Sequence, residues 1–493
     1  MNAAEAHSPT PIGYTEKTQN FTTKIVNYEV KLLNTKTISE NSTSRLATLS
    51  WKERLGYGVG DAGFNFYWAL IGGYLAAFYT DTLGLSAAMA AGVIFWAKIV
   101  DAFTDPLMGA IADRTNTRWG KFRPYLVWGA IPMGISAVLA FSTPDLSLQG
   151  KAIWAFATYC AMMLCYTILS TPYSSLSGVI TGNVRERNLL VSVRFIFAFL
   201  ASALIGKFTP DLIEALGESN PELGWQMSVA LYGTIASVIF LITFLFTKER
   251  VAPPPTQKTR PTEDIKELLQ NRAWIILFIL ALILMITFTL RAGSAFYYFK
   301  YYVGQEGLLG NYLFWQSIAY LTGCLATPFL MSAFDKRKLL IVLMSIVAIL
   351  SFIFYFVPKD MIWAMFTLNI LISLALGPKS PLTWSMYADA ADYNEWRTGN
   401  RATAMTFSAA TFSQKLGSAA GSAAMLGLLG MLGYQANQAQ TGASMDGINF
   451  LQTALPGIFA LIAVVVVSFY NLSNKKLDLI QTELAERASM ANR

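Results

Sequence analysis

Residues 86–111 read SAAMAAGVIFWAKIVDAFTDPLMGAI, and this stretch establishes the fold class. It is long enough to cross a bilayer as a helix, which takes about 20 residues. It nevertheless contains Lys98, Asp101 and Asp105, whose spacing places all three side chains on one helix face. Charges at such depth are costly and usually serve a function. We therefore expect a membrane protein in which these charges meet and form a cation or proton site.

The overall composition extends this interpretation to the whole chain. Of its 493 residues, 54% are hydrophobic and 14% are charged, and the mean hydropathy is +0.43. Soluble domains carry roughly 25% charged residues. The net charge of +7 does not indicate nucleic-acid binding, because the basic residues lie in short loops between apolar spans. The expected partner of the chain's surface is the lipid bilayer.

About twelve apolar segments of helical length follow one another along the chain. A charged, proline-containing interruption at 248–272 divides them six and six. The predicted organisation is a cytoplasmic tail (1–52), a six-helix bundle (53–247), a central cytoplasmic loop (248–272), a second six-helix bundle (273–471) and a cytoplasmic tail (472–493). The predicted fold class is an all-α membrane protein with twelve transmembrane helices in two pseudo-symmetric bundles.

Lysine and arginine residues concentrate in every second loop, whereas the intervening loops carry few cations and several acids. Cytoplasmic loops are the basic ones in membrane proteins. Both termini are therefore expected in the cytoplasm. The first 50 residues lack the layout of a cleaved signal. We expect a multi-pass protein of a bacterial-type cytoplasmic (inner) membrane.

An internal repeat supports the division into halves. ADRTNTRWGKFRP (112–124) follows the second span, and AFDKRKLL (333–340) stands in the equivalent place of the second half. GNVRERN (182–188) after the fourth span is echoed by DYNEWRTGNR (392–401) after the tenth. This layout resembles the major facilitator superfamily, whose members bind substrate near the middle of the membrane, between the halves.

The acids of the second span suit a small cation. With Lys98 and both aspartates ionised, the cluster carries a charge of −1, and Thr104 between the acids could add a hydroxyl ligand. Sodium needs several hard oxygen ligands. Alternatively, one carboxylate holds a proton, because two close acids in a low dielectric do not both ionise readily. A purely structural ion-pair network is the remaining interpretation.

The first span contains a pattern suited to a sugar. Asn65 lies one helical turn beyond Asp61, and Trp68 follows three residues later. Polar groups beside an indole ring can bind sugar hydroxyls and stack on the apolar sugar face. Trp68 could equally face lipid, and Asp61 could equally cap or pair near the helix start.

Other spans also contain polar or aromatic residues that could contact a sugar. An arginine fork such as that of Arg194 binds hydroxyls or a carboxylate well, but it could instead pair with Asp61 or Asp101. Lys415 could bridge from the eleventh span to the acidic cluster. The predicted substrate contacts are Asp61, Asn65, Trp68, Tyr166, Ser170, Arg194, Trp384 and Lys415.

Charged residues in two cytoplasmic turns are predicted to act as gates and not as binding sites. They can latch helix ends, and breaking such latches would permit a conformational change. The predicted gating residues are Asp113, Arg118, Lys121, Arg123, Asp389, Asp392, Arg397 and Arg401.

The reactive residue types argue against an enzyme. The single histidine, His7, lies in the polar N-terminal tail, and the three cysteines lie in apolar segments without metal-ligand spacing. No nucleophile–base pair is visible. We expect no cofactor and no metal apart from a coupling Na+, the alternative coupling ion being H+.

The motifs YTDTLGLS, DAFTDPLMG, TRWGKFRPY, TPYSSL with RERN, and MYADAADYNEWRTGNRATAM occur in that order. Together they resemble the glycoside–pentoside–hexuronide:cation symporters, the family of the melibiose permease, from about Glu53 to the end of the twelfth span. The resemblance implies alternating access and a cation site at Asp101 and Asp105, with Thr167 from the fourth helix. It also matches Lys415 and Arg194 to the family's lysine and arginine.

Three departures from the melibiose permease matter. Asn65 and Ser170 stand where that transporter has two galactoside-binding aspartates, and Thr104 replaces an asparagine between the cation-site acids. The first two differences argue against α-galactosides as substrates. The third leaves the choice between Na+ and H+ open.

The sequence therefore predicts a secondary active symporter that imports a glycoside, pentoside or sugar acid with Na+ or H+. Its partner is a small-molecule sugar, and a monomer is the expected form. Two alternatives remain: a lipid or drug carrier on the same fold, and a sugar sensor that does not transport. The first needs a larger and more apolar site, and the second needs an output domain.

Overall fold

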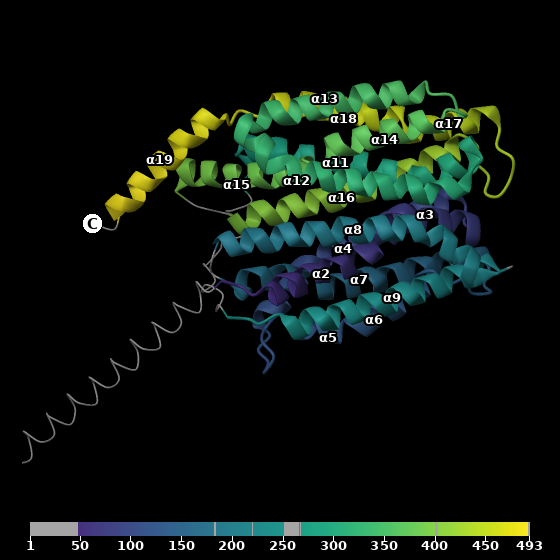
Figure 1. Ribbon diagram of the computed structural model, residues 1–493, viewed down its shortest axis with the longest axis horizontal. Helices are drawn as coiled ribbons and strands as arrows, with labels where there is room; N and C mark the ends of the chain where they lie inside the picture. The colour runs from purple at the N-terminus through teal and green to yellow at the C-terminus, as the bar shows by residue number, and fades with distance from the viewer. Residues whose placement is uncertain are drawn as a thin grey trace, which may run out of the picture.

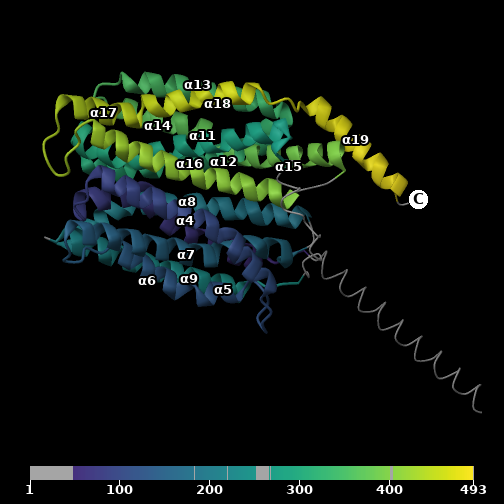
Figure 2. The same cartoon turned by 180° about the vertical axis from the view of Figure 1, so that it is seen from behind.

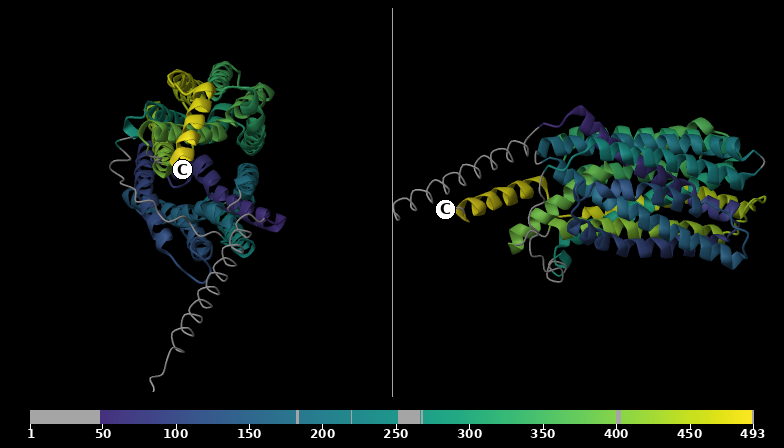
Figure 3. Two further views of the ribbon diagram at one scale, coloured as in Figure 1. Left: turned by 90° about the vertical axis from the view of Figure 1, so that its left-hand side faces the viewer. Right: turned by 90° about the horizontal axis from the view of Figure 1, so that it is seen from below.

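The computed structural model describes residues 48–181, 184–218, 220–250, 266, 268–399 and 403–491. Within these ranges the chain is helical, apart from turns, loops and one isolated β-bridge between Thr117 and Gly120. The helices run side by side along the length of the molecule, with the first half of the chain below the second half in Figure 1. Seen from the end that carries α19 (Asn474–Ala491), the two halves form separate groups (Figure 3).

Each predicted span of the first half has a helical counterpart. Some spans are interrupted, so that two or three consecutive elements form one rod. The elements are α2 (Trp51–Gly73) with α3 (Leu75–Ala77) and the π-helical turn η1 (Phe78–Thr82); α4 (Ala87–Arg114); α5 (Pro124–Trp128) with α6 (Ala130–Ala140); α7 (Leu148–Ile180); α8 (Val184–Gly217); and α9 (Pro221–Phe246).

The second half repeats this arrangement, which confirms the predicted all-α, two-bundle fold for the described residues. Its elements are α11 (Arg272–Tyr297) with the π-helical turn η2 (Tyr298–Val303); the 3-10 turn η3 (Glu306–Leu308) with α12 (Leu309–Ala333); α13 (Lys336–Tyr355); α14 (Ile362–Leu376) with α15 (Lys379–Thr398); α16 (Thr403–Met431); and α17 (Gly442–Gln452) with α18 (Ala454–Ser468). The tail predicted at 472–493 contains α19. Most of the predicted N-terminal tail and of the central loop lies outside the described residues.

Side-chain oxygens determine where several helices begin. Ser50 accepts a hydrogen bond from the backbone of Glu53, whose carboxylate accepts one in return. Ser86 caps α4 through the backbone of Met89, and Asp335 caps α13. Such contacts satisfy backbone N–H groups that have no partner within the helix. The polar residues between the apolar spans therefore also start the next helix.

Eight helical segments among the described residues are long and apolar enough to cross a membrane by length and composition alone. The remaining rods are not among these eight: α2 contains Asp61, α16 contains Lys415, and α6 is a shorter apolar helix. The outward faces remain strongly apolar, with Phe329 78% and Ile153 69% exposed. Large apolar side chains exposed in such number are expected where the surrounding solvent is lipid.

The two halves meet along two long helix pairs. Helix α4 packs along α16, and α8 packs along α12. Figure 2 shows both pairs at the level where the halves join. Residues on α4, α8, α12 and α16 are therefore placed to interact across the interface between the halves.

Candidate functional site

The two acids of α4 lie together at the interface between the halves. The Lys415 ammonium of α16 is 2.7 Å from Asp101 Oδ2 and 2.6 Å from Asp105 Oδ2. The Thr167 hydroxyl of α7 lies 3.0 Å from one oxygen of each carboxylate, so it can donate to either. The Asp101 side chain is 3% exposed and that of Asp105 is 28% exposed. Three helices from both halves thus supply one buried cluster with a formal charge of −1.

The expectation that Lys98 meets these carboxylates is wrong for this structure. Its ammonium donates to the side chains of Ser418 and Ser422 on α16, at 2.7 and 3.0 Å, and lies 3.3 Å from the backbone oxygen of Ser418. The spacing on α4 is as predicted, but the long lysine side chain extends to the serine hydroxyls of the adjacent helix. Lys415, which lies one turn before Ser418 on α16, contacts the acids instead.

Thr104, predicted as a fourth ligand, is also directed elsewhere. Its hydroxyl donates to the backbone oxygen of Asp101 at 2.8 Å, one turn earlier on the same helix. Back-bonding of this kind is common for threonine within helices. Thr167 supplies the hydroxyl contact to the acids that was expected of Thr104.

A second polar cluster is formed by residues of α2, α7 and α8. Arg194 Nη2 donates to Asp61 Oδ1 at 3.1 Å, which is the pairing that the sequence left open. The guanidinium also contacts the Tyr57 hydroxyl at 3.3 Å and lies over the Tyr173 ring, 4.9 Å from its centroid. The rings of Tyr57 and Tyr173 stack at 4.8 Å. Arg194 is therefore held in place but stays partly exposed, whereas Asp61 is buried.

Three other predicted contacts of the first half lie near the Arg194–Asp61 pair. The rings of Trp68 and Tyr166 face each other, with centroids 6.2 Å apart. Tyr166 lies within electrostatic range of both Asp61 and Asp101. Asn65 donates to the Asp61 backbone at 2.8 Å and accepts from Ser202 of α8 at 3.4 Å.

Ser170 and Trp384 differ in their placement. Ser170 is partly exposed on α7, one turn beyond Thr167, and so shares a helix face with the cation cluster. Trp384, predicted as a sugar contact, stacks on Phe407 of α16 at 5.5 Å and contacts Tyr387. It is 37% exposed, and its ring contacts connect it to neither polar cluster. The structure does not bring Trp384 together with the other candidates.

The turn at 115–123 is bound to the end of α9. The Glu249 carboxylate accepts the backbone N–H groups of Lys121, Phe122 and Arg123 at 2.8, 2.8 and 3.0 Å. Gly120 precedes them with φ of 109°, a conformation that favours glycine. Arg123 donates to the Phe244 backbone at 2.6 Å. Burial lowers the pKa of Arg123, and the charge of Glu249 opposes this shift.

The other predicted gating residues have varied surroundings. Asp389 on α15 accepts two contacts from the Lys336 ammonium, at 2.7 and 2.9 Å, at the start of α13. Arg397 donates to the Gln270 backbone at 2.6 Å, next to α11. Arg118 is exposed over the Trp119 ring, and Asp392 is partly exposed. These contacts of the turn, Asp389 and Arg397 join helix ends of the same half; the Asp113 side chain and Arg401 lie outside the described residues.

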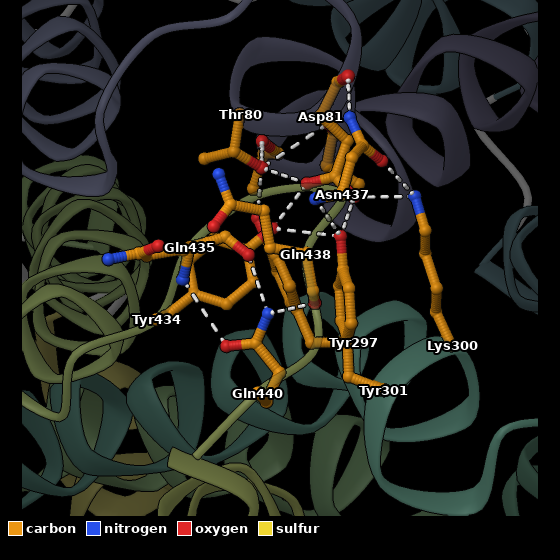
Figure 4. Close-up of polar contacts among 12 residues, drawn as sticks. Thr80, Asp81, Tyr297, Lys300, Tyr301, Tyr434, Gln435, Asn437, Gln438 and Gln440 are labelled. Carbon is orange, nitrogen blue, oxygen red and sulfur yellow. Dashed lines mark hydrogen bonds and ion pairs between the residues drawn. The ribbon is translucent and has the colours of Figure 1, made fainter.

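Sequence reasoning missed a network of polar contacts that joins the halves (Figure 4). It lies next to α3, at the end of the molecule opposite α19 (Figure 1). Asp81, at the end of the first rod, lies 2.7 Å from the Lys300 ammonium and accepts from the hydroxyls of Tyr301 and Tyr434. Asn437 donates to the Asp81 backbone at 2.6 Å and accepts from Lys300 at 2.8 Å. The only signal was the motif YTDTLGLS, which contains Asp81 but does not indicate its partners.

Comparison with known proteins completes the description of the site. A family model described as MFS/sugar transport protein matches residues 56–474. The chain is 34% identical to the "Putative glycoside/cation symporter YagG" of Escherichia coli (strain K12), over 89% of this chain and 96% of that protein. It is 31% identical to the "Isoprimeverose transporter" of Lactiplantibacillus pentosus, over 88% and 90%. The "Glucuronide carrier protein homolog" of Escherichia coli (strain K12) is 30% identical, over 89% and 96%.

Solved structures show the same fold at low sequence identity. A D-xylose-proton symporter matches with a TM-score of 0.64 and 15% identity, over 86% of this chain and 99% of that one. A single-residue mutant of the nucleoside transporter NupG matches with a TM-score of 0.61 and 15% identity, over 86% and 100%. At such identity these structures inform on the fold alone.

Proposed function

Because this chain belongs to the MFS/sugar transport family, we propose that it imports a sugar together with Na+ or H+ by alternating access. The family confirms the predicted major facilitator fold and the prediction that the chain is a transporter and not an enzyme. Relatives named for glycosides, isoprimeverose and glucuronide support a sugar substrate. Neither the lipid or drug carrier nor the sensor is favoured by these relatives.

The cluster of Asp101, Asp105, Thr167 and Lys415 is the observation that carries this proposal. Lys415 neutralises one of the two negative charges and bridges the halves through α16 and α4. A proton or a sodium ion that binds the carboxylates competes with the ammonium for the same oxygens. Binding of the coupling ion would therefore release a contact between the halves as well as neutralise the site. This is the differential interaction that a conformational change requires.

The adjoining residues of the first half suit a sugar. Arg194 and Asp61 present charged donors and acceptors, and Trp68 with Tyr166 presents aromatic surface. Asn65 and Ser170 add polar groups on the same helices. Tyr166 lies within electrostatic range of Asp61 and Asp101, so a sugar bound against its ring would lie near the coupling ion. By linkage, each ligand would then raise the affinity for the other.

Alternating access needs one closed end at a time. We assign the Asp81–Lys300 network to closure of the extracellular end, with α19 and both termini on the cytoplasmic side. The contacts of Glu249 and of Lys336 with Asp389 hold helix ends together within each half. The segments 53–247 and 273–471 would then move as two bodies of one monomer in a bacterial-type inner membrane.

Uptake by reconstituted vesicles tests the proposal. Vesicles with an imposed inward sodium or proton gradient are given labelled xylosides, β-glucosides and glucuronides, and accumulation is compared with that in gradient-free vesicles. We expect one sugar class to accumulate with one ion. Asp105→Asn should abolish accumulation, whereas Asp211→Asn, at an exposed extracellular-side acid, should preserve it. The proposal fails if no sugar accumulates under either gradient, or if the Asp105 variant accumulates sugar fully.

A further inference from the structure

The rod formed by α14 and α15 is interrupted near its middle, where α14 ends at Leu376 and α15 begins at Lys379. Pro378 lacks a backbone N–H and interrupts the helical hydrogen bonds there. Gly377 packs directly against α12, because a Cβ at this position would lie 2.6 Å from the backbone oxygen of Tyr320. The break is thus fixed by a close backbone contact with a helix that lies at the interface between the halves.

Lys379 is a buried cation at this break. The residue is only 8% exposed, and its ammonium lies over the Phe288 ring of α11, 4.7 Å from the centroid. Among the residues that the structure describes, no acid forms an ion pair with it. By contrast, Lys415 has two carboxylates and Arg194 has Asp61. A charge buried inside a membrane bundle without a counter-ion indicates a ligand or ion pathway.

A second buried cation lies on the helix that carries Phe288. Gly377 and Pro378, which link α14 to α15, both have right-handed helical backbone, so Lys379 lies at a kink within one continuous rod. Arg291 of α11, one turn beyond Phe288, is fully buried as well. Its Nη2 donates to Asn369 at 2.8 Å, and the guanidinium also lies close to the hydroxyls of Tyr312 and Tyr320.

Aromatic contacts connect Lys379 to the sugar candidates of the first half. The Phe288 ring lies 5.9 Å from that of Tyr320, which stacks on Phe199 of α8 at 6.2 Å. Phe199 lies one turn before Ser202, the residue that contacts Asn65. Aromatic rings of this kind suit the apolar faces of a pyranose. The sugar ring and its charged group would therefore be recognised by opposite halves.

We infer that Lys379 binds the carboxylate or sulfonate of an acidic sugar, so that the preferred substrate is a sugar acid and not a neutral glycoside. This inference rests on the proposed function and names the substrate class of the same site. Lys379 contributes a charge-assisted hydrogen bond to the anion. A neutral sugar would leave the lysine without a counter-charge.

Matched sugar pairs that differ only at C6 test the inference. Methyl β-glucoside is compared with methyl β-glucuronide, and 6-deoxyglucose with its 6-sulfonate. Gradient-driven uptake and the concentration that half-saturates ligand-induced thermal stabilisation are measured for each sugar. We expect the wild type to prefer the anionic members by at least about tenfold. Lys379→Met should remove that preference while leaving uptake of the neutral sugars within about twofold.

Two control variants accompany this comparison. Lys379→Arg should retain the preference because it keeps the charge. Lys207→Met should behave as wild type, because Lys207 forms an ion pair with Asp211 one turn along α8 at a partly exposed site. If Lys379→Met does not fold, Lys379→Gln takes its place. The preference of the wild type for anionic over neutral sugars tests the inference independently of either variant.

The outcomes separate this inference from the proposed function. If the wild type accumulates only neutral sugars, symport stands and the role of Lys379 is refuted. Equal loss of both members of a pair in the Lys379 variants would also refute it. If no sugar accumulates in the wild type under either gradient, the proposed function fails and the inference falls with it.

Discussion

The Lys300 ammonium lies 2.7 Å from the Asp81 carboxylate and so joins the second half of the bundle to the first. The Asp81 side chain is only 5% exposed, and two tyrosine hydroxyls also donate to it. Removing one partner of an ion pair that is buried in this way leaves the other charge buried without compensation, which strongly destabilises the contact between the halves. Substituting either residue of the pair should therefore shift the equilibrium between the closed and open forms of this end.

Asp81→Asn is predicted to shift that equilibrium toward separation of the halves. The loss of a buried charged partner corresponds to roughly 1–3 kcal/mol, or about 5–150-fold in a two-state equilibrium. Spin labels at Leu146 and Gln438, both exposed near this end, report the separation by pulsed electron resonance. The variant should populate longer distances than the wild type. The exchange Asp81→Lys with Lys300→Asp serves as the control and should restore part of the short distance; unchanged distances in Asp81→Asn would contradict the assignment.

Thr167 and Thr104 form a matched pair for the cation site. Thr167→Ala removes a hydroxyl that lies 3.0 Å from both carboxylates, whereas Thr104→Ala removes one that donates to its own helix backbone. We expect Thr167→Ala to lower the apparent cation affinity about 5- to 10-fold, in line with a lost hydrogen bond of about 1 kcal/mol or more to a charged group. Thr104→Ala should change it by less than about twofold.

The concentration of Na+ or H+ that gives half-maximal sugar uptake measures this difference. Thr167→Ser, which keeps the hydroxyl, should stay near the wild-type value. An equal effect of the Thr104 and Thr167 substitutions would show that the hydroxyl contacts of the structure do not define the ion site.

Lys415→Met is predicted to raise the apparent affinity for the coupling cation. The ammonium occupies oxygens of both carboxylates, so its removal eliminates a competitor and leaves the cluster with one more negative charge. The expected gain is on the order of tenfold, since each 1.4 kcal/mol corresponds to that factor. Isothermal titration with Na+, or proton uptake on a pH shift, provides the measurement.

Lys98→Met is the matched control for this variant. Lys98 contacts serine oxygens of α16 and not the acids, so its removal should lower the thermal stability of the α4–α16 contact with little change in cation affinity. If Lys98→Met, and not Lys415→Met, raised the affinity, the original pairing expected from the sequence would be the functional one.

Glu249→Ala is predicted to destabilise the fold of the first half. Three backbone N–H groups of residues 121–123 would lose their acceptor, which corresponds to about 1–3 kcal/mol. The midpoint of thermal unfolding in detergent should fall accordingly. Asp145→Ala, at an exposed position on the opposite end, should leave it unchanged. A midpoint equal to that of the wild type would mean that this carboxylate does not hold the turn in place.

Local periodicity and composition were enough to predict the spans, their division into two halves, and the two acids that share one helix face in the cation site. Apolar length specifies where a chain can span a membrane, basic loops divide the spans, and helical spacing places Asp101 and Asp105 on one face. Asp61 and Arg194 were also recognisable as a possible pair, because two opposite charges within apolar spans have few alternatives.

Which residues meet across helices became visible only in the folded bundle. There Lys415 and not Lys98 lies beside the acids, and Thr167 takes the place expected of Thr104. Trp384 is set apart, and Asp81 meets Lys300, a residue 219 positions further along the chain. Helical spacing assigns a side chain to a face, but its partner depends on how each helix is rotated and shifted against its neighbours. That arrangement follows from packing of the whole bundle and leaves no local pattern in the sequence.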